Sequence, residues 1–378
     1  MDFEYSDDQR MLADSVARLL SDRYTFDARR LYLKEGSGWS AALWEQYAEL
    51  GLLGVPFAEA HGGFGGGAVD VMMVMEAFGR SLVLEPFLAS VVLGGAALRH
   101  GGTAAQQAEL LPRVIDGSLK LAFAHGERQA RYDLSDVLTT AARDGAGWVL
   151  EGAKSVVFHG DCADRLVVSA RTAGDRCDAG GITLFLVDAA AAGVARRGYA
   201  LHDGMRAAEI SLSGVRVGAD AVLGPVDGGL ALVERITEAG IAAMAAEMVG
   251  AMEAMHAMTL DYAKTRQQFG KPIGSNQVVQ HRLAEMLVEL EQARSMAMLA
   301  AMTLDEPDDA ERARAISMVK LAVGQAARFV SQNAVQLHGG IGMTEEYAVG
   351  HYFRRAMVFE HSFGDSAHHL QRIAATVR

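Results

Sequence analysis

Apolar residues recur at helical spacing over the first third of the chain. From 6 to 115 they stand three and four positions apart, which predicts a helical N-terminal region. A glycine-rich stretch at 61–67 interrupts the pattern. It lacks a preceding strand and the spacing of a phosphate-binding loop. We therefore expect a structural turn, in which glycine supplies positive φ.

Short runs rich in β-branched residues replace the helical pattern between 118 and 223. The clearest runs are 148–150, 165–171, 182–188 and 208–217. Such runs, separated by Gly and Asp, are typical of strands. No helix-length segment lies between them, whereas parallel strands need long crossovers. The pattern therefore predicts antiparallel pairing in a barrel or sandwich.

Helical periodicity returns from about residue 228 and holds almost to the end, with Ala and Met dense at 241–252 and 283–302. Four amphipathic stretches are expected, at 228–265, 276–303, 308–338 and 364–377. Together the patterns predict an α+β multidomain chain. Its expected parts are an N-terminal α-helical domain (1–117), a middle antiparallel β-barrel-like domain (118–225) and a C-terminal four-helix bundle (226–378).

Composition narrows the function classes. The 378 residues carry 35 Lys+Arg against 47 Asp+Glu, a net charge of −12, which disfavours nucleic acid as a partner. No uncharged apolar run approaches the roughly 18 residues of a membrane span. Neither a signal-peptide pattern nor a metal motif around Cys162 and Cys177 is present. We expect a cytoplasmic protein that uses no metal and does not bind a membrane.

Two C-terminal segments, 266–277 and 336–347, carry candidate chemistry. Arg266 can clamp a pyrophosphate through two charge-assisted bonds, and Phe269 offers a ring face. Adjacent glycines, Gly339 and Gly340, let backbone N–H groups approach a phosphate or ribose closely. From the residues alone, Arg266 could equally be a solvated helix-end cation and the glycines a helix C-cap.

The chain resembles the acyl-CoA dehydrogenase family. The resemblance rests on these two motifs, on the opening segment 3–23 (including DFEYSDDQRML), on the segment 42–56 and on the glycine cluster. Within that family it is most similar to the small subunits of pimeloyl-CoA-type dehydrogenases. The resemblance implies the acyl-CoA dehydrogenase fold, FAD as cofactor, an acyl-CoA substrate and an electron-transfer flavoprotein as electron acceptor. It also implies a homo-oligomer or a hetero-oligomer with a large dehydrogenase subunit.

The resemblance further implies which residues bind FAD. Across a subunit interface, the pyrophosphate and adenosine end would be bound by four residues: Arg266, Gln268, Phe269 and Gln277. Three residues of the second motif would complete the site: Gln336, Gly339 and Gly340.

The family's usual catalytic base, a Glu in a Tyr-Glu-Gly-Thr-Ser motif, is absent here. Residues 362–366 read Ser-Phe-Gly-Asp-Ser, so Phe363 stands at the base position. Another position used in the family falls on Gly240, and Glu247 lies two turns further on the same helix face. Glu247 is our first choice for the base, Asp365 the second and Glu238 the third.

Each of the first two candidates has a structural alternative. Glu247 could be paired with an Arg or Lys of a neighbouring helix. Asp365 is well placed to cap the helix that follows it.

A further departure concerns the flavin ring. The family's ring-contacting Thr-Glu-Pro-Gly-Ala-Gly-Ser-Asp loop corresponds to 125–133, and Val156 stands where the family has Trp. Either a partner subunit holds the ring, or the pocket is remodelled for a bulky or carboxylated acyl chain. Arg128 or Arg131 could pair with a distal carboxylate, although both also suit an ordinary surface.

The expected function is that of an FAD-dependent acyl-CoA dehydrogenase subunit that converts an acyl-CoA, such as the dicarboxylyl thioester pimeloyl-CoA, to the trans-2-enoyl-CoA. The Phe363 backbone N–H would polarise the thioester carbonyl. The alternative is a non-catalytic structural subunit that completes the FAD site of a catalytic partner.

Overall fold

The computed structural model describes residues 6–376, which fold into two compact units. The first unit consists of three segments: the chain as far as Tyr32, the segment Ala68–Val83, and the residues from Ile241 onward. The second holds Leu33–Gly67 and Leu84–Gly240. The N-terminal helical region is thus divided between the two units.

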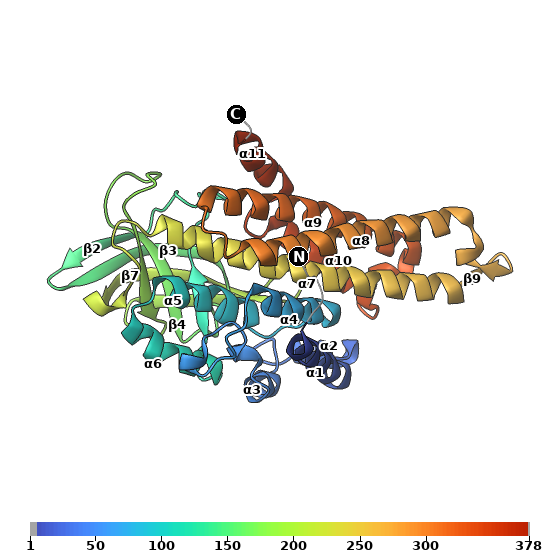
Figure 1. Ribbon diagram of the computed structural model, residues 1–378, viewed down its shortest axis with the longest axis horizontal. Coiled ribbons are helices and arrows are strands. Elements are labelled where there is room, and N and C mark those ends of the chain that lie inside the picture. The colour runs from blue at the N-terminus through green and yellow to red at the C-terminus, as the bar shows by residue number, and fades with distance from the viewer. Residues whose placement is uncertain (1–5, 377–378) are drawn as a thin grey trace. The chain divides into compact units, whose positions relative to one another are not determined.

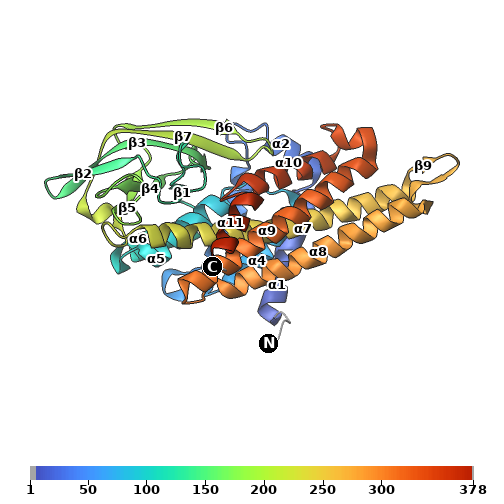
Figure 2. The same ribbon diagram turned by 90° about the horizontal axis from the view of Figure 1, so that it is seen from above.

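The first unit consists of helices and one short hairpin. Its helices are α1 (Asp7–Arg23), α2 (Phe26–Tyr32), α4 (Ala68–Ser81), most of α7 (Leu230–Thr265), α8 (Gln277–Thr303), α9 (Asp309–His338), α10 (Ala348–His361) and α11 (Ser366–Thr376). Figures 1 and 2 show α8 and α9 lying side by side as long antiparallel rods. The four predicted C-terminal helices correspond to α7, α8, α9 and α11.

Helix α10 is an addition to the predicted four. Its buried residues include Val349, Tyr352, Ala356 and Phe359, which stand at helical spacing. The periodic signal was therefore present in the sequence. It follows directly on a glycine-rich motif and contains Gly350, which obscured the start of the helix.

Side-chain caps explain where several of these helices begin. Ser6 and Gln9 form a capping box at the start of α1. The Asp308 carboxylate accepts the Ala310 and Glu311 N–H groups at the start of α9, at 2.8 and 3.1 Å. Each cap satisfies backbone donors that have no partner within the helix.

Two glycines let α4 and α7 cross with their backbones almost in contact. A Cβ at Gly79 would lie 1.9 Å from the Glu247 carbonyl oxygen, and one at Gly250 would lie 1.9 Å from the Glu76 carbonyl oxygen. Beside the crossing, Arg80 donates to Glu76 at 2.5 Å and to Glu253 at 2.8 Å. Helix α4 is thereby fixed against the helix that carries Glu247.

The second unit combines short helices with one sheet. Its α-helices are α3 (Ala41–Glu49), α5 (Gly95–Gly101), α6 (Ala104–Ile115) and the start of α7 up to Gly240, and a π-helix at Leu88–Gly94 precedes α5. The strands are β1 (Leu121–Ala124), β2 (Thr140–Asp144), β3 (Gly147–Phe158), β4 (Arg165–Arg171), β5 (Ile182–Asp188), β6 (Val194–Ala200), β7 (Arg206–Val217) and β8 (Val222–Leu223). They follow the order β6-β7-β3-β2-β4-β5-β8, with β1 beside β4. A buried cluster that includes Trp148, Leu166 and Phe185 fills the sheet's inner face.

The sheet confirms the predicted all-β middle region but differs in two details. Most neighbours pair antiparallel, whereas β1 runs parallel to β4 and β2 also meets β4 in parallel at Thr140 and Arg171. The chain between β1 and β4 contains β2 and β3 and is long enough for a crossover. The strand path also runs open from β6 to β8 instead of closing into a barrel.

The glycine cluster is a structural turn, as predicted. Gly62 and Gly65 have φ of 88° and 66°. A Cβ at Gly63 would lie 2.2 Å from the Phe57 carbonyl oxygen. Backbone N–H groups of the cluster donate to carbonyls of 54–58. The glycines therefore fold the chain back on itself.

Within residues 6–376, no helix has both the length and the apolar run that crossing a bilayer requires. The same residues contain no group of three or more His, Cys, Asp or Glu side chains arranged to hold a metal ion.

Candidate active site and cofactor-binding segments

The first motif forms a hairpin that follows α7. Strands β9 (Gln267–Gln268) and β10 (Lys271–Pro272) pair antiparallel. The two residues between them, Phe269 and Gly270, have φ of 53° and 81°. Two successive positive φ values are typical of the type I′ turn that joins tight hairpins. The Phe269 side chain is fully exposed at the tip.

The polar side chains of this motif point outward. Arg266, Gln268 and Gln277 are all exposed. Within the described part of the chain, the Arg266 guanidinium has no hydrogen-bond or ion-pair partner. A free guanidinium can donate two parallel bonds to a phosphate. The hairpin is therefore available to an anionic ligand.

The second motif starts where α9 ends. Gly339 has φ of 64°, and a Cβ at Gly339 or Gly340 would meet no atom within 4 Å. Gln336 is exposed on the last turn of α9. Open space beside two glycines leaves the backbone accessible to a ligand.

An aromatic contact brings the two motifs together. Tyr262, near the end of α7, stacks on His338 with ring centroids 4.5 Å apart. His338 Nδ1 donates to the Ala334 carbonyl at 2.8 Å, which leaves Nε2 to accept from the Tyr347 hydroxyl at 3.2 Å. Burial lowers the pKa of His338, so the ring is neutral at physiological pH. The sequence interpretation missed Tyr262 and His338 because neither has a phosphate-binding side chain.

Glu247 is held in a buried ion pair. Arg355 of α10 donates from Nε to Oε1 at 2.7 Å and from Nη2 to Oε2 at 2.6 Å. The two side chains are 5% and 4% exposed. Both carboxylate oxygens are thus committed to one guanidinium, the structural alternative foreseen for this residue. Sequence reasoning missed Arg355 because it missed α10.

The loop 362–365 joins α10 to α11. Phe363 and Gly364 have φ of 56° and 109°. Asp365 caps α11, since its Oδ1 accepts the His368 N–H at 2.8 Å. Asp365 is half-buried, and its second oxygen has no hydrogen bond within the described chain. Glu238, the third candidate, is buried.

A buried lysine binds the end of α10, and a buried histidine binds this loop. Lys320 donates to the Glu360 carbonyl at 3.1 Å, and burial lowers its pKa to about 8. The fully buried His369 donates from Nε2 to the Phe363 carbonyl at 3.0 Å. Burial lowers the pKa of His369 to about 3, so the side chain stays neutral.

This burial predicts an acid-sensitive stability. As pH falls from 6.5 toward 3, His369 protonates in the unfolded chain but not in the folded one. The unfolded state then binds more protons, so stability falls with pH. The variant His369→Gln keeps an N–H donor but does not titrate. In urea denaturation below pH 6.5, its free energy of unfolding is expected to fall by about 1.4 kcal/mol less per pH unit than that of the wild type.

His202→Gln, at an exposed position, serves as the control. If the stability of His369→Gln and of the wild type declined in parallel over this range, His369 would not be the titrating group.

The two segments that correspond to the family's flavin-ring loops meet in the second unit. The Ser155 N–H donates to the Gly126 carbonyl at 2.8 Å. Val156, with φ of 53°, is half exposed at an irregularity of β3. Arg128 Nη2 lies 3.4 Å from Glu209 Oε2. The exposed Arg131 has no partner among the described residues.

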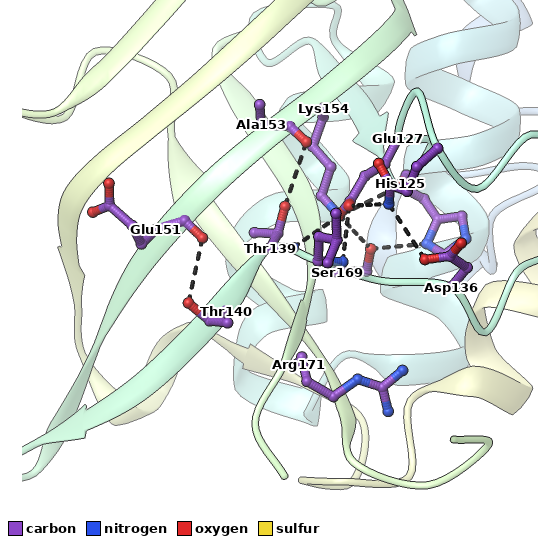
Figure 3. Close-up of polar contacts among 12 residues, drawn as sticks. His125, Glu127, Asp136, Thr139, Thr140, Glu151, Ala153, Lys154, Ser169 and Arg171 are labelled. Carbon is purple, nitrogen blue, oxygen red and sulfur yellow. Dashed lines mark hydrogen bonds and ion pairs between the residues drawn. The ribbon is translucent and has the colours of Figure 1, made fainter. Parts of the chain in front are cut away.

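Two residues in or next to these segments in the sequence, Glu127 and Lys154, belong to a buried polar cluster (Figure 3). Lys154 of β3 donates to the Glu127 carboxylate at 2.7 Å and to Ser169 Oγ at 3.1 Å. Burial would raise the pKa of Glu127, but the Lys154 charge and hydrogen bonds from several donors lower it to about 2. Sequence analysis did not single out Lys154, Glu127 or Ser169, since one lysine among strand residues gives no signal of burial.

The chain thus has helical segments before and after a β region, an exposed guanidinium at Arg266 and an accessible glycine backbone at Gly339 and Gly340, features that suit a dinucleotide-dependent enzyme without a Rossmann sheet. Three family models match the chain: the acyl-CoA dehydrogenase N-terminal domain over 6–118, the middle domain over 122–215 and the C-terminal domain over 227–377. The chain belongs to the acyl-CoA dehydrogenase family.

Curated relatives agree with this assignment. Acyl-CoA dehydrogenase FadE12 of Mycobacterium tuberculosis is 33% identical over 82% of this chain and 81% of its own length. The probable acyl-CoA dehydrogenase YngJ of Bacillus subtilis is 30% identical over 99% of this chain and 98% of its own.

Solved structures show the same fold. A variant of the Tcur3481-Tcur3483 steroid ACAD is 30% identical with a TM-score of 0.88 and covers 98% of both chains. The ChsE4-ChsE5 complex of Mycobacterium tuberculosis is 27% identical with a TM-score of 0.88, over 100% of this chain and 99% of that one. Butyryl-CoA dehydrogenase of Megasphaera elsdenii is 25% identical with a TM-score of 0.92 over both full chains. The protein is an oxidoreductase that acts on CH–CH groups of acyl-CoA with FAD as cofactor.

The described residues fit this cofactor. The Arg266 guanidinium has no partner among the described residues and would suit a pyrophosphate, and the backbone at Gly339 and Gly340 is open to a ligand. For the ring, the Gly126 and Ser155 segments are in contact, and Val156 leaves more room than a tryptophan would.

Proposed function

We propose that this chain is one subunit of an acyl-CoA dehydrogenase in which a partner subunit supplies the base that removes the α-proton. The assembly converts an acyl-CoA to the trans-2-enoyl-CoA. The observation that carries the proposal is the buried Glu247–Arg355 pair, together with Phe363 at the family's base position. The chain's foremost carboxylate candidate is committed to structure.

In this scheme the chain's own residues bind and orient. Arg266 clamps the FAD pyrophosphate, with Gln268, Phe269 and Gln277 beside it. Backbone N–H groups at Gly339 and Gly340 approach the dinucleotide together with Gln336. The Phe363 N–H polarises the thioester carbonyl. FAD, when bound, supplies the acceptor for the β-hydrogen, which leaves as hydride.

The names of two similar structures support a two-component assembly. One is described as a ChsE4-ChsE5 complex and the other as Tcur3481-Tcur3483, and each is similar to this chain over nearly its whole length. From the resemblance to the family we further propose that this chain pairs with a second, larger dehydrogenase subunit and passes its electrons to an electron-transfer flavoprotein.

A self-sufficient dehydrogenase is the second candidate, with Glu247 or Asp365 as base. One observation favours Asp365. Its second oxygen has no hydrogen bond in the described chain, and it lies two residues beyond Phe363. Asp365→Asn keeps the cap through its side-chain oxygen and removes the base.

The acyl chain is a separate proposal. Exposed Arg131 has no partner among residues 6–376, which suits a distal carboxylate such as that of pimeloyl-CoA. Arg128 fits this role less well, because it lies beside Glu209.

The deciding test uses this chain alone, loaded with FAD and mixed anaerobically with a medium-chain or dicarboxylyl acyl-CoA. We expect the flavin absorption band to shift as the thioester binds but not to bleach. Bleaching that persists in Glu247→Gln and disappears in Asp365→Asn would overturn the partner-base proposal in favour of Asp365. Bleaching lost in Glu247→Gln at unchanged flavin content would assign the base to Glu247.

A further inference from the structure

His125 lies at the end of β1, on the opposite side of the strand from the hydrophobic cluster. Ala122 and Ala124 point into that cluster, so Phe123 and His125 share the other face. Their rings are nearly parallel, with an interplanar angle of 8° and centroids 5.6 Å apart. We call this pair the ring ledge.

The strand register places Ser169 against His125. Strands β1 and β4 pair in parallel up to Ala124 and Val168, so the next residues along are His125 and Ser169. Ser169 Oγ lies 2.8 Å from His125 Nδ1. Ser169 is fully buried, so its hydroxyl proton must find an acceptor within the protein.

Lys154 decides the direction of that hydrogen bond. Its ammonium has three protons and three acceptors: Glu127 Oε1 at 2.7 Å, Ser169 Oγ at 3.1 Å and the His125 carbonyl at 3.2 Å. Ser169 Oγ therefore accepts from Lys154 and donates its own proton to His125 Nδ1. The neutral imidazole must then carry its proton on Nε2.

The Nε2–H of His125 is a donor without a partner. No hydrogen bond to it occurs among the described residues, although the residue is only 8% exposed. The Nε2 atom is not completely enclosed by protein. Burial, and after it the Lys154 charge, lowers the pKa of His125 to about 3, so the donor is neutral. Figure 3 shows His125, Glu127, Lys154 and Ser169 converging from separate segments.

A single fixed donor beside an aromatic ring suits a planar heteroaromatic ligand with acceptors on its edge. The exposed Gly126 and Val156 segments lie next to the ring ledge, since the Ser155 N–H binds the Gly126 carbonyl. We infer that His125 is a flavin-positioning residue that donates from Nε2 to an acceptor on the edge of the isoalloxazine ring. The chain Glu127–Lys154–Ser169 holds it in the required tautomer.

The inference rests on the proposed binding of FAD by this chain, and its test separates the two. FAD affinity and the flavin midpoint potential are measured for the full chain and for His125→Leu, which has no donor. We expect the dissociation constant for FAD to rise about tenfold, the size of one neutral hydrogen bond. If the bond favours reduced flavin tenfold, the potential falls by about 30 mV.

Two variants and a labelling experiment distinguish positioning from mere packing. His125→Gln keeps an N–H donor, so its flavin midpoint potential is expected to return most of the way to the wild-type value. His202→Leu, at an exposed site, should leave both the dissociation constant for FAD and the midpoint potential unchanged. Nitrogen-15 spectra of labelled histidine should show His125 protonated at Nε2 only. Ser169→Ala should lose this fixed tautomer.

Each outcome is decisive. If the wild-type chain binds no FAD, both the proposed function and this inference fail. If it binds FAD but His125→Leu leaves affinity, potential and spectrum unchanged, the inference alone is overturned. A wild-type His125 protonated at Nδ1 would also overturn it.

Discussion

Replacing Arg355 with methionine is expected to lower the free energy of unfolding by about 3–5 kcal/mol, because it leaves the Glu247 carboxylate buried without a partner. The two side chains are at most 5% exposed, and Arg355 binds both carboxylate oxygens. Water therefore cannot replace the lost bonds. Urea denaturation at neutral pH would measure the change.

The matched control removes both charges at once. The double variant Glu247→Leu with Arg355→Met should be far more stable than Arg355→Met alone, because well-packed apolar residues often replace a buried pair at little cost. Arg10→Ala breaks the exposed Arg10–Asp7 pair and should cost at most about 1 kcal/mol. If Arg355→Met unfolded no more easily than Arg10→Ala, the pair would not be a structural element and Glu247 would again be available for chemistry.

Replacing Arg266 with alanine is expected to weaken FAD binding by about two orders of magnitude or more. Two charge-assisted hydrogen bonds at about 1.5–3 kcal/mol each would be lost. Because the Arg266 guanidinium has no partner within the described chain, its removal should leave the fold intact. Isothermal titration with FAD measures the affinity, and far-ultraviolet circular dichroism checks the fold.

Lys264→Ala is the matched control for this variant. Lys264 is an exposed cation two residues earlier on the same helix end, and its replacement removes the same charge without the guanidinium geometry. Equal losses in the two variants would mean that Arg266 acts only through general electrostatic attraction. No loss in Arg266→Ala would remove this hairpin from the FAD site.

Sequence patterns predicted most of the architecture because the relevant signals are local. The helical period placed α8 and α9 within a few residues of their observed ends, and alternating β-branched runs located β4, β5 and β7. The parallel β1–β4 pair was not predictable in the same way. This pairing depends on the position at which the chain comes back beside β1 after a long crossover, and the periodicity of the sequence carries no information on that position.

The candidate site was predictable only in part, for a related reason. Arg266, Gly339 and Gly340 stand in compact motifs whose chemistry is visible residue by residue. The partner of Glu247 lies 108 residues away, and pairing at that distance leaves no trace in one sequence. Lys154 presents the same difficulty, since its role depends on Glu127 and Ser169 from other segments.

Four of the seven non-glycine residues with positive φ in the described chain lie in segments assigned to binding or catalysis: Arg131, Val156, Phe269 and Phe363. Such a conformation costs an ordinary residue roughly 1–2 kcal/mol. Glycine at any of the four positions would relieve this strain. With its native side chains at these positions, the protein therefore has a lower free energy of unfolding than the same fold with glycine there. A search for heat-resistant variants should enrich glycine at these positions, with function lost where the side chain contacts a ligand.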